Sequence, residues 1–164
     1  MPEQWFDELA ELLRIPSISA DEAHAGDVVR AGEWVRDVVR GAGGDCDLVD
    51  WNGEPLVIGE LRSSSGGDAP TVLCYGHFDV QPPDPLELWD SPPFEPEIRG
   101  EYLYGRGTVD DKGQLYMLLS AARELATSGE LPVNVRSAAT GRRRRAATRS
   151  SSTSRRTSGA PTRR

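Results

Sequence analysis

The sequence predicts a single layered α/β domain that is incomplete at its C-terminal side. Its 164 residues suit one ordinary domain. Segments with helical spacing of apolar residues alternate with short β-prone runs through residues 1–136. The large apolar residues then stop, because the last aromatic residue is Tyr116 and the last Val, Leu, Ile or Met is Val135. We therefore place the folded part of the chain at residues 1–136.

Two amphipathic helices are predicted near the N-terminus. Apolar residues recur at helical spacing from Trp5 to Leu13, and this helix should end before Pro16, because the residue preceding a proline disfavours the α region. A second helix is predicted at residues 25–40, where Gly41 stops it. We interpret both helices as packing elements of the domain.

The other regular elements are predicted to be strands and one further helix. Asn52-Gly53 lies between two β-prone runs and indicates a hairpin, and Gly100 divides a third run in the same way. The compact apolar run at residues 71–75 is typical of a buried central strand. The predicted strands lie at residues 48–51, 56–61, 71–75 and 98–104, and the helix lies at 114–127.

Charge divides the chain into two unlike parts. Residues 1–130 hold all 26 acidic residues and nine of the 19 basic ones, so their formal net charge is −17, while residues 131–164 hold ten basic residues and no acid, a charge of +10. Residues 137–164 use only Ser, Ala, Thr, Gly, Arg and Pro. Such a segment has no large apolar side chain to bury against the entropy of ordering. We expect residues 137–164 to be disordered.

Several protein classes are excluded. No apolar run approaches the roughly 18–20 residues that a membrane-spanning helix needs, and the first residues are acidic and aromatic, unlike a signal peptide. We therefore expect a cytoplasmic protein without a membrane partner. The two cysteines, Cys46 and Cys74, form neither a disulfide framework nor a C-x-x-C pair, and neither is assigned a role.

The most informative segment reads Y-G-H-F-D-V, from Tyr75 to Val80. Side chains alternate in extended backbone, so His77 and Asp79 should point to the same side. A histidine that binds a metal commonly donates its second ring N–H to a carboxylate, which fixes the tautomer. An isolated H-x-D pair is weak evidence for a site, because such pairs often occur by chance.

A second candidate segment is D-D-K-G, which begins at Asp110 and directly precedes the last predicted helix. Acidic residues at a helix N-terminus interact favourably with the helix dipole, so this segment alone has a purely structural explanation. A proline-dense loop separates it from the H-x-D pair, with six prolines within residues 82–96. Such a loop is stiff, because each proline restricts its own φ angle.

Together these segments resemble the M20 family of metallopeptidases, and within it the dipeptidase branch that includes carnosine dipeptidases. The shared motifs are Y-G-H-F-D-V-Q-P, L-W-D-S-P-P-F-E-P-E-I-R, L-Y-G-R-G and D-D-K-G-Q, within residues 75–114, and R-I-P-S-I-S matches more loosely upstream. The resemblance implies that residues 1–136 are the N-terminal part of a catalytic domain with a three-layer, zinc-peptidase-like sheet and flanking helices.

The resemblance also assigns roles to individual residues. His77 is expected to bind one of two metal ions, usually zinc and in some members manganese. Asp79 is the catalytic carboxylate that supports the site, and Asp110 bridges both ions. The peptide bond between Asp110 and Asp111 should be cis. The implied reaction is hydrolysis of a peptide bond in small peptides by a water molecule that two metal ions activate.

The later groups of that site are missing from this chain. The family takes its general base from a Glu-Glu pair after a strand that begins L-P-V-N-V-R, but residues 137–145 read S-A-A-T-G-R-R-R-R. No acid follows Glu130 and no histidine follows His77, while His24 has the setting of a solvated surface side chain. We therefore expect this chain alone to have little or no peptidase activity.

A change of reading frame after Arg136 would explain the arginine run. Repeated GAG codons for glutamate become AGG codons for arginine when read one base late, and a GC-rich gene read out of frame gives the composition of residues 137–164. This is a hypothesis that the nucleotide sequence tests.

The expected partner is a small peptide substrate. Full-length relatives are implied to be homodimers, whereas this chain would lack their lid and dimerisation domain. As an alternative, the chain is a noncatalytic fragment whose basic tail binds nucleic acid or acidic surfaces nonspecifically; no specific nucleic-acid partner is expected, because the tail has no aromatic residues for stacking. A third interpretation is an unstable fragment with an uncovered sheet edge.

Overall fold

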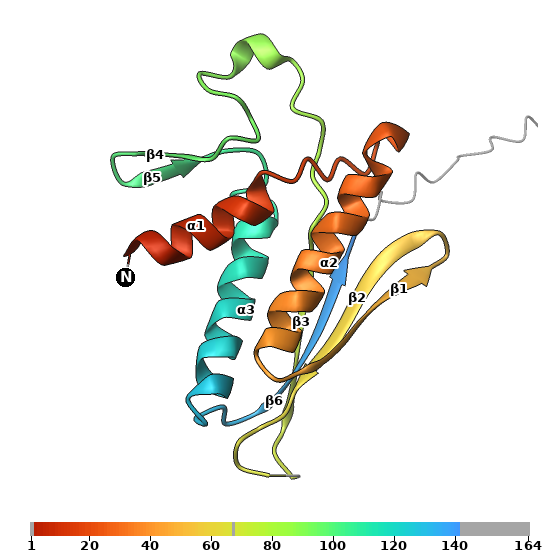
Figure 1. Cartoon of the computed structure of the whole chain (residues 1–164), viewed down its shortest axis with the longest axis vertical. Helices are drawn as coiled ribbons and strands as arrows, with labels where there is room; N and C mark the ends of the chain where they lie inside the picture. The colour runs from red at the N-terminus through yellow and green to blue at the C-terminus, as the bar shows by residue number, and fades with distance from the viewer. Residues whose placement is uncertain (1, 67, 142–164) are drawn as a thin grey trace, which may run out of the picture.

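The computed structural model describes residues 2–66 and 68–141. Three helices and a four-stranded mixed sheet form its main body, and a two-stranded hairpin lies apart from that sheet (Figure 1). The predicted α/β class is therefore confirmed. The α-helices and strands are α1 (Pro2–Leu13), α2 (Ala25–Gly41), β1 (Asp45–Trp51), β2 (Glu54–Leu61), β3 (Thr71–His77), β4 (Glu97–Arg99), β5 (Tyr102–Tyr104), α3 (Lys112–Thr127) and β6 (Asn134–Thr140), and two short 3₁₀ helices lie at Glu22–His24 and Leu86–Leu88.

The local signals in the sequence place most of these elements correctly. Helix α1 ends before Pro16 and α2 extends one residue past the predicted helix, to Gly41. Asn52 and Gly53 both have positive φ angles, 56° and 83°, which is the conformation that a two-residue hairpin turn between β1 and β2 requires. Helix α3 begins at Lys112, two residues before the predicted start.

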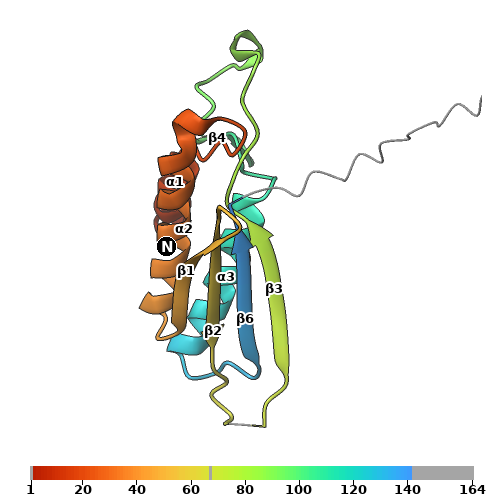
Figure 2. The ribbon, with the colours of Figure 1, turned by 90° about the vertical axis from the view of Figure 1, so that its right-hand side faces the viewer.

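The sheet has the strand order β1-β2-β6-β3. Strand β6 pairs in antiparallel fashion with β2 and in parallel with β3, so β6 is an inner strand although it comes last in the described chain. The helices gather on one side of the sheet (Figure 2), where α2 contacts β1 and β2, and α3 contacts β3. The core lies between these two layers. Its fully buried residues include Leu12, Val35, Val57, Phe78 and Leu131.

The opposite face of the sheet carries no helix among the residues that the structure describes. Ile58, Leu73 and Tyr75 alternate with the buried positions of the sheet and are exposed, and the last two retain 68% and 58% of their accessible surface. A third layer on this face, as in the expected three-layer architecture, stays a prediction.

Strand β3 does not occupy the central position predicted for its apolar run. It lies at the edge of the described sheet, and Val72, Leu73 and Tyr75 are exposed. The run of β-branched and aromatic residues suits any strand with apolar neighbours, so its composition does not determine its place in the sheet. The inner place belongs to β6, because β6 has partners on both of its edges.

The predicted start of disorder at residue 137 is wrong for residues 137–140, which form the second half of β6. Backbone hydrogen bonds to two flanking strands do not require large side chains. Ser137 and Ala139 are buried, and a Cβ on Gly59 would lie 2.8 Å from Ser137 Oγ, so small side chains suit this crowded part of the sheet. The rest of the expected disordered segment, residues 142–164, lies outside the described residues.

None of the described helices combines the length and the apolar character that crossing a membrane requires. The expected cytoplasmic location stays a prediction.

Candidate metal centre

The candidate site lies where β3 ends. Strands β3 and β6 run parallel, and His77 at the end of β3 is paired with Thr140 at the end of β6. The chain continues this pairing for one residue, since Phe78 N donates to Thr140 O at 3.0 Å. Ligands of open α/β sheets bind at the carboxyl ends of the strands. His77 therefore lies at the edge of the sheet where this fold class places its sites.

The two ring nitrogens of His77 face different groups. Nδ1 lies 3.1 Å from Asp79 Oδ1 and 3.2 Å from the Asp79 carbonyl oxygen, whereas Nε2 lies 3.1 Å from Asp110 Oδ1. Carbonyl and carboxylate oxygens can only accept, so both ring nitrogens face acceptors. In the neutral ring the single proton is assigned to Nδ1, which has the Asp79 carbonyl oxygen as its hydrogen-bond acceptor, and Nε2 is then the nitrogen without a proton. Both predicted partners of His77 are thus brought to it, on opposite sides of the ring.

Burial separates the two carboxylates. The Asp79 side chain is only 1% exposed, whereas that of Asp110 is 49% exposed. The hydrogen bond from His77 to the Asp79 carboxylate raises the pKa of His77 above its ordinary value, and burial of the ring opposes this rise. Asp79 is therefore a fixed internal partner of the imidazole, while Asp110 lies half exposed at the surface.

Asp111 has a role that the sequence did not indicate. It occupies the N-cap position of α3, but its side chain makes no capping hydrogen bond. Its Oδ2 instead accepts the backbone N–H of His77 at 3.0 Å, and a Cβ on Gly76 would come within 2.9 Å of that oxygen. The Asp110-Asp111 peptide bond is cis, as expected. Asp111 thus ties the D-D-K-G segment to β3 and holds Asp110 beside His77.

Lys112 belongs to the same segment and points into the protein. It is fully buried, and its Nζ donates to the carbonyl oxygens of Leu12 at 2.9 Å and Ile15 at 2.6 Å. These two carbonyls lie at the C-terminal end of α1 and just after it. Burial lowers the pKa of the Lys112 ammonium group to about 7. Lys112 therefore connects α1 and the segment that follows it to the start of α3.

Two serines after α1 also reach the end of β3. Ser17 Oγ donates to the Phe78 carbonyl at 2.6 Å, and Ser19 Oγ donates to Asp79 Oδ2. From the sequence, R-I-P-S-I-S is only a looser match to the family, and its serines have no assigned role. A Ser-x-Ser alternation in extended backbone, which puts both hydroxyls on one side, is the signal that could have found this contact.

The geometry of His77 and Asp110 fits two ligands of one zinc ion. Two ligand atoms at about 2.1 Å from a tetrahedral zinc ion lie about 3.4 Å apart, and the observed Nε2 to Oδ1 distance is 3.1 Å. No cluster of three or more His, Cys, Asp or Glu side chains suited to a metal ion occurs within residues 2–66 and 68–141. The described residues thus offer a pair of ligands and no complete coordination shell.

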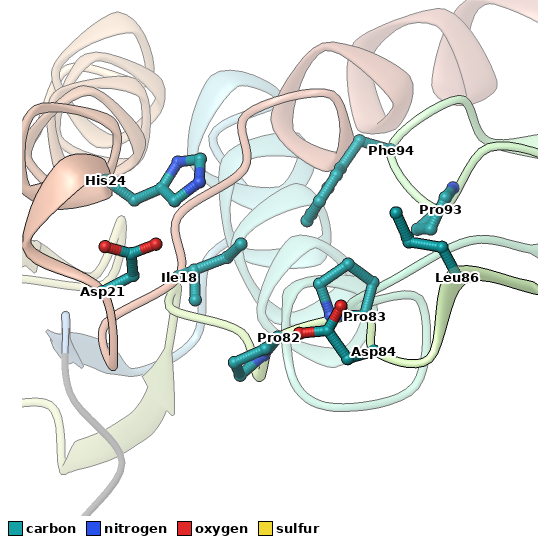
Figure 3. Close-up of a pocket in the computed structure, with 9 residues that line it drawn as sticks. All are labelled: Ile18, Asp21, His24, Pro82, Pro83, Asp84, Leu86, Pro93 and Phe94. Atoms are coloured by element: carbon teal, nitrogen blue, oxygen red, sulfur yellow. The ribbon is translucent and has the colours of Figure 1, made fainter.

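A pocket of about 420 Å³ lies beside the loop that carries Ser17 and Ser19 (Figure 3). Ile18 and His24 line it on one side, and the proline-dense loop, with Leu86 and Phe94, lines it on the other. His24 Nδ1 is 2.7 Å from Asp27 Oδ2 and its side chain is 30% exposed. His77, Asp79 and Asp110 do not line this pocket, so His24 is not brought to the candidate site.

The family to which these features point is found by comparison with known proteins. Residues 73–142, which include the end of β3, the D-D-K-G segment and β6, match the model of Peptidase family M20/M25/M40. The chain belongs to this family. The match starts just before His77 and covers every residue to which a site role is assigned above except Ser17 and Ser19.

Individual M20 relatives support the assignment. The chain is 36% identical over 125 residues to succinyl-diaminopimelate desuccinylase of Stenotrophomonas maltophilia, which covers 74% of this chain and 30% of that protein. Among solved structures it is similar to human carnosine dipeptidase 1 (TM-score 0.77, 27% identity, 85% of this chain and 32% of that one). An M20 metallo-carboxypeptidase from Sulfolobus solfataricus is also similar (TM-score 0.74, 32% identity, 85% and 31%). The chain spans about a third of each relative's length.

Proposed function

We propose that His77 and Asp110 are ligands of a zinc ion and that Asp79 orients His77 for this role. The observation that carries the proposal is the geometry of the ring: Nδ1 is held by Asp79, which leaves Nε2 turned to Asp110 Oδ1 at 3.1 Å. A neutral imidazole nitrogen and a carboxylate oxygen are both common zinc ligands. Manganese, the other expected metal, favours oxygen ligands and is the weaker candidate for a site that contains His77.

The chain's own residues prepare this site before any metal binds. The Asp79 carbonyl oxygen faces Nδ1 of His77 at 3.2 Å and the Asp79 carboxylate lies 3.1 Å from the same nitrogen, so Asp79 favours the tautomer that a metal at Nε2 requires. Asp110 Oδ1 faces His77 at 3.1 Å, and in a complete site the Asp110 carboxylate would be the group shared with a second ion. In a complete M20 site the ions would polarise the scissile carbonyl and lower the pKa of a bound water molecule.

A complete hydrolase needs a base that this chain does not supply at the expected position. The Glu-Glu pair is expected after the strand that begins L-P-V-N-V-R, and residues 137–141, which complete and follow that strand, read S-A-A-T-G. Without a carboxylate to take the proton of the attacking water, hydrolysis is slowed by a factor of roughly 10² to 10⁴. We propose that the 164-residue chain is catalytically deficient and that its complete relatives hydrolyse amide bonds.

The substrate class of the complete enzyme has two candidates. Structural similarity to human carnosine dipeptidase 1 supports a dipeptide, which the sequence motifs also predict. The curated relatives at 36% and 32% identity are desuccinylases, which supports a succinylated amine as the second candidate. Both are small amides, so the proposed chemistry is the same. A protein made from the gene with its frame restored would be assayed on both, and the higher kcat/KM decides between them.

Metal binding by the existing chain tests the site directly. Zn²⁺ titrated into the 164-residue chain should bind, and His77→Ala and Asp110→Asn should each weaken binding at least tenfold. His24→Gln removes the other histidine and should leave the affinity unchanged. Equal affinities in all four proteins would show that His77 and Asp110 do not form the site.

The hypothesis of a changed reading frame is tested by the gene. The other frame after codon 136 should encode an acidic stretch of the form E-G-x-E-E, and its absence would remove the hypothesis. The alternative in which the basic tail binds nucleic acid has no support from the comparisons. Its residues 142–164 lie outside the described part of the chain.

A further inference from the structure

We propose that Ser19 is a positioning residue of the metal centre: its hydroxyl holds Asp79 Oδ2, and this keeps Asp79 Oδ1 on His77 Nδ1. The inference rests on the metal centre proposed above and extends it to a residue that lies outside the family match at residues 73–142. The inference concerns how the chain orients the His77 ring before a metal ion binds.

The two oxygens of Asp79 have different partners. Oδ1 lies 3.1 Å from His77 Nδ1 in an ion-pair contact, beside the 3.2 Å contact of Nδ1 with the Asp79 carbonyl oxygen, and Oδ2 accepts the hydrogen bond of Ser19 Oγ. Rotation of the carboxylate would break both interactions at once. Because the Asp79 side chain is only 1% exposed, water has little access to replace them. Ser19 therefore determines which carboxylate oxygen of Asp79 faces the His77 ring and how the plane of that carboxylate is oriented.

The Ser19 hydroxyl is delivered by a segment that is itself held on two sides. On the β3 side, Val80 N donates to Ser17 O at 2.8 Å and Ser17 Oγ donates to Phe78 O at 2.6 Å. On the helix side, Lys112 Nζ binds the carbonyl of Ile15 at 2.6 Å. These hydrogen bonds fix the chain at Ile15 and Ser17, just before Ser19. The Ser19 hydroxyl can therefore bind Asp79 with little further loss of backbone conformational entropy.

These contacts form a continuous path around the site. Lys112 follows Asp110 and Asp111 in the chain, and it holds the carbonyls that precede Ser17 and Ser19. Ser19 holds Asp79, Asp79 holds His77, and His77 faces Asp110. One connected set of contacts, from the buried Lys112 hydrogen bonds to the half-exposed Asp110, thus positions both His77 and Asp110. Outer groups of this kind commonly change metal affinity by about 10- to 100-fold when they are removed.

A merely structural Ser19 would satisfy a buried carboxylate without affecting the ring. The two roles differ in their effect on His77, which can be read directly because the chain contains only two histidines. The full 164-residue chain is labelled with ¹⁵N-histidine, and His24→Gln assigns the remaining signals to His77. Spectra recorded well above the pKa of the ring report the tautomer, and addition of Zn²⁺ reports binding at Nε2.

The variants are Ser19→Ala, Ser19→Thr and the control Ser137→Ala, which also removes a buried hydroxyl. We expect Ser19→Ala to increase the Nε2–H tautomer of His77 and to weaken Zn²⁺ binding about tenfold. Ser19→Thr keeps the hydroxyl and should restore both properties, and Ser137→Ala should change neither. If Ser19→Ala does not fold, Ser19→Cys, which has a similar size and a weak donor, takes its place with the same expectation.

A double-mutant cycle that combines Ser19→Ala with Asp79→Asn tests whether Ser19 acts through Asp79. If Ser19 acts through the Asp79 carboxylate, Ser19→Ala should cost much less Zn²⁺ affinity in the Asp79→Asn background than in the wild-type chain. Equal costs in both backgrounds, or an unchanged tautomer and affinity in Ser19→Ala, would overturn the proposal. Failure of the metal centre itself looks different: Zn²⁺ would then leave the His77 signals of the wild-type chain unmoved, while the tautomer would still report on Ser19.

Discussion

Gly113 lies directly against the carbonyl group of Thr108: a Cβ placed on Gly113 would be 2.0 Å from the Thr108 oxygen. Its backbone N–H also donates to Gly107 O at 3.3 Å, so the loop before α3 folds back onto the first turn of that helix. The glycine of D-D-K-G is thus required by a close backbone contact. This contact packs the loop that carries Asp110 against the helix that follows it.

Gly113→Ala should therefore destabilise the fold by about 3 kcal/mol or more, because the added methyl group can be accommodated only if the backbone of the loop moves. The matched control is Gly26→Ala in α2, where a Cβ would meet nothing within 4 Å. Alanine favours a helix over glycine by up to about 1 kcal/mol, so this variant should be as stable as the wild type or more so. Urea unfolding of both variants measures the difference, and equal stabilities would contradict the packing described here.

Local patterns predicted the elements and half of the site. The Asn52-Gly53 turn and the period-two spacing of His77 and Asp79 involve neighbouring residues, so the sequence shows them directly. The contact between His77 and Asp110 joins residues 33 positions apart, and it was expected only through the resemblance to a family. Asp111 was interpreted as a helix-terminal acid because nothing in D-D-K-G shows that its carboxylate turns back to β3.

Two further features depend on the fold as a whole. Ser19 and Asp79 are 60 positions apart, and a serine near a helix end has no distinctive pattern. The place of β3 at the edge of the described sheet depends on where β6 inserts, and β6 is formed partly by the small residues 137–140. Apolar content alone predicted neither the edge position of β3 nor the strand at residues 137–140, because a strand is held by its backbone partners as well as by its side chains.

Lys112→Met should destabilise the fold by about 2 to 4 kcal/mol although the two side chains have similar lengths. Methionine has no donor, so the carbonyls of Leu12 and Ile15 would lose a partner in a buried place. The buried position suits an apolar side chain, which offsets part of this cost. The free energy of unfolding in urea checks the prediction. A Lys112→Met chain as stable as the wild type would show that these two hydrogen bonds contribute nothing net.

The two cysteines should differ strongly in reactivity. Cys46 is buried, and this burial raises the pKa of its thiol to about 11, whereas Cys74 is partly exposed on the edge strand β3. Relative to an ordinary thiol this leaves Cys46 with roughly a hundredth of the thiolate at neutral pH, before its limited access is considered. A thiol reagent should therefore label Cys74 at least about a hundredfold faster. Cys74→Ser should remove the fast phase, and a single rate for both thiols would contradict this assignment.

Stability at low pH should depend on Glu8, which joins α1 to α3. Its carboxylate accepts hydrogen bonds from the Arg123 guanidinium group and from Tyr116 Oη, the latter at 2.8 Å. The Arg123 hydrogen bond lowers the pKa of Glu8 below its ordinary value of 4.5, against the opposing effect of burial. A lowered folded-state pKa means that this contribution is complete above pH 4.5 and is lost as the pH falls through the folded-state pKa.

Glu8→Gln should thus cost about 1 kcal/mol at neutral pH, and the difference from the wild type should shrink as the solution is acidified. The control is Glu124→Gln, which makes the same chemical change at an exposed position on α3. It should leave the neutral-pH stability within about 0.5 kcal/mol. Urea unfolding of the three chains across the acid range checks the sign: a Glu8→Gln deficit that stays constant at every pH would mean that the lost interaction does not depend on the charge of Glu8.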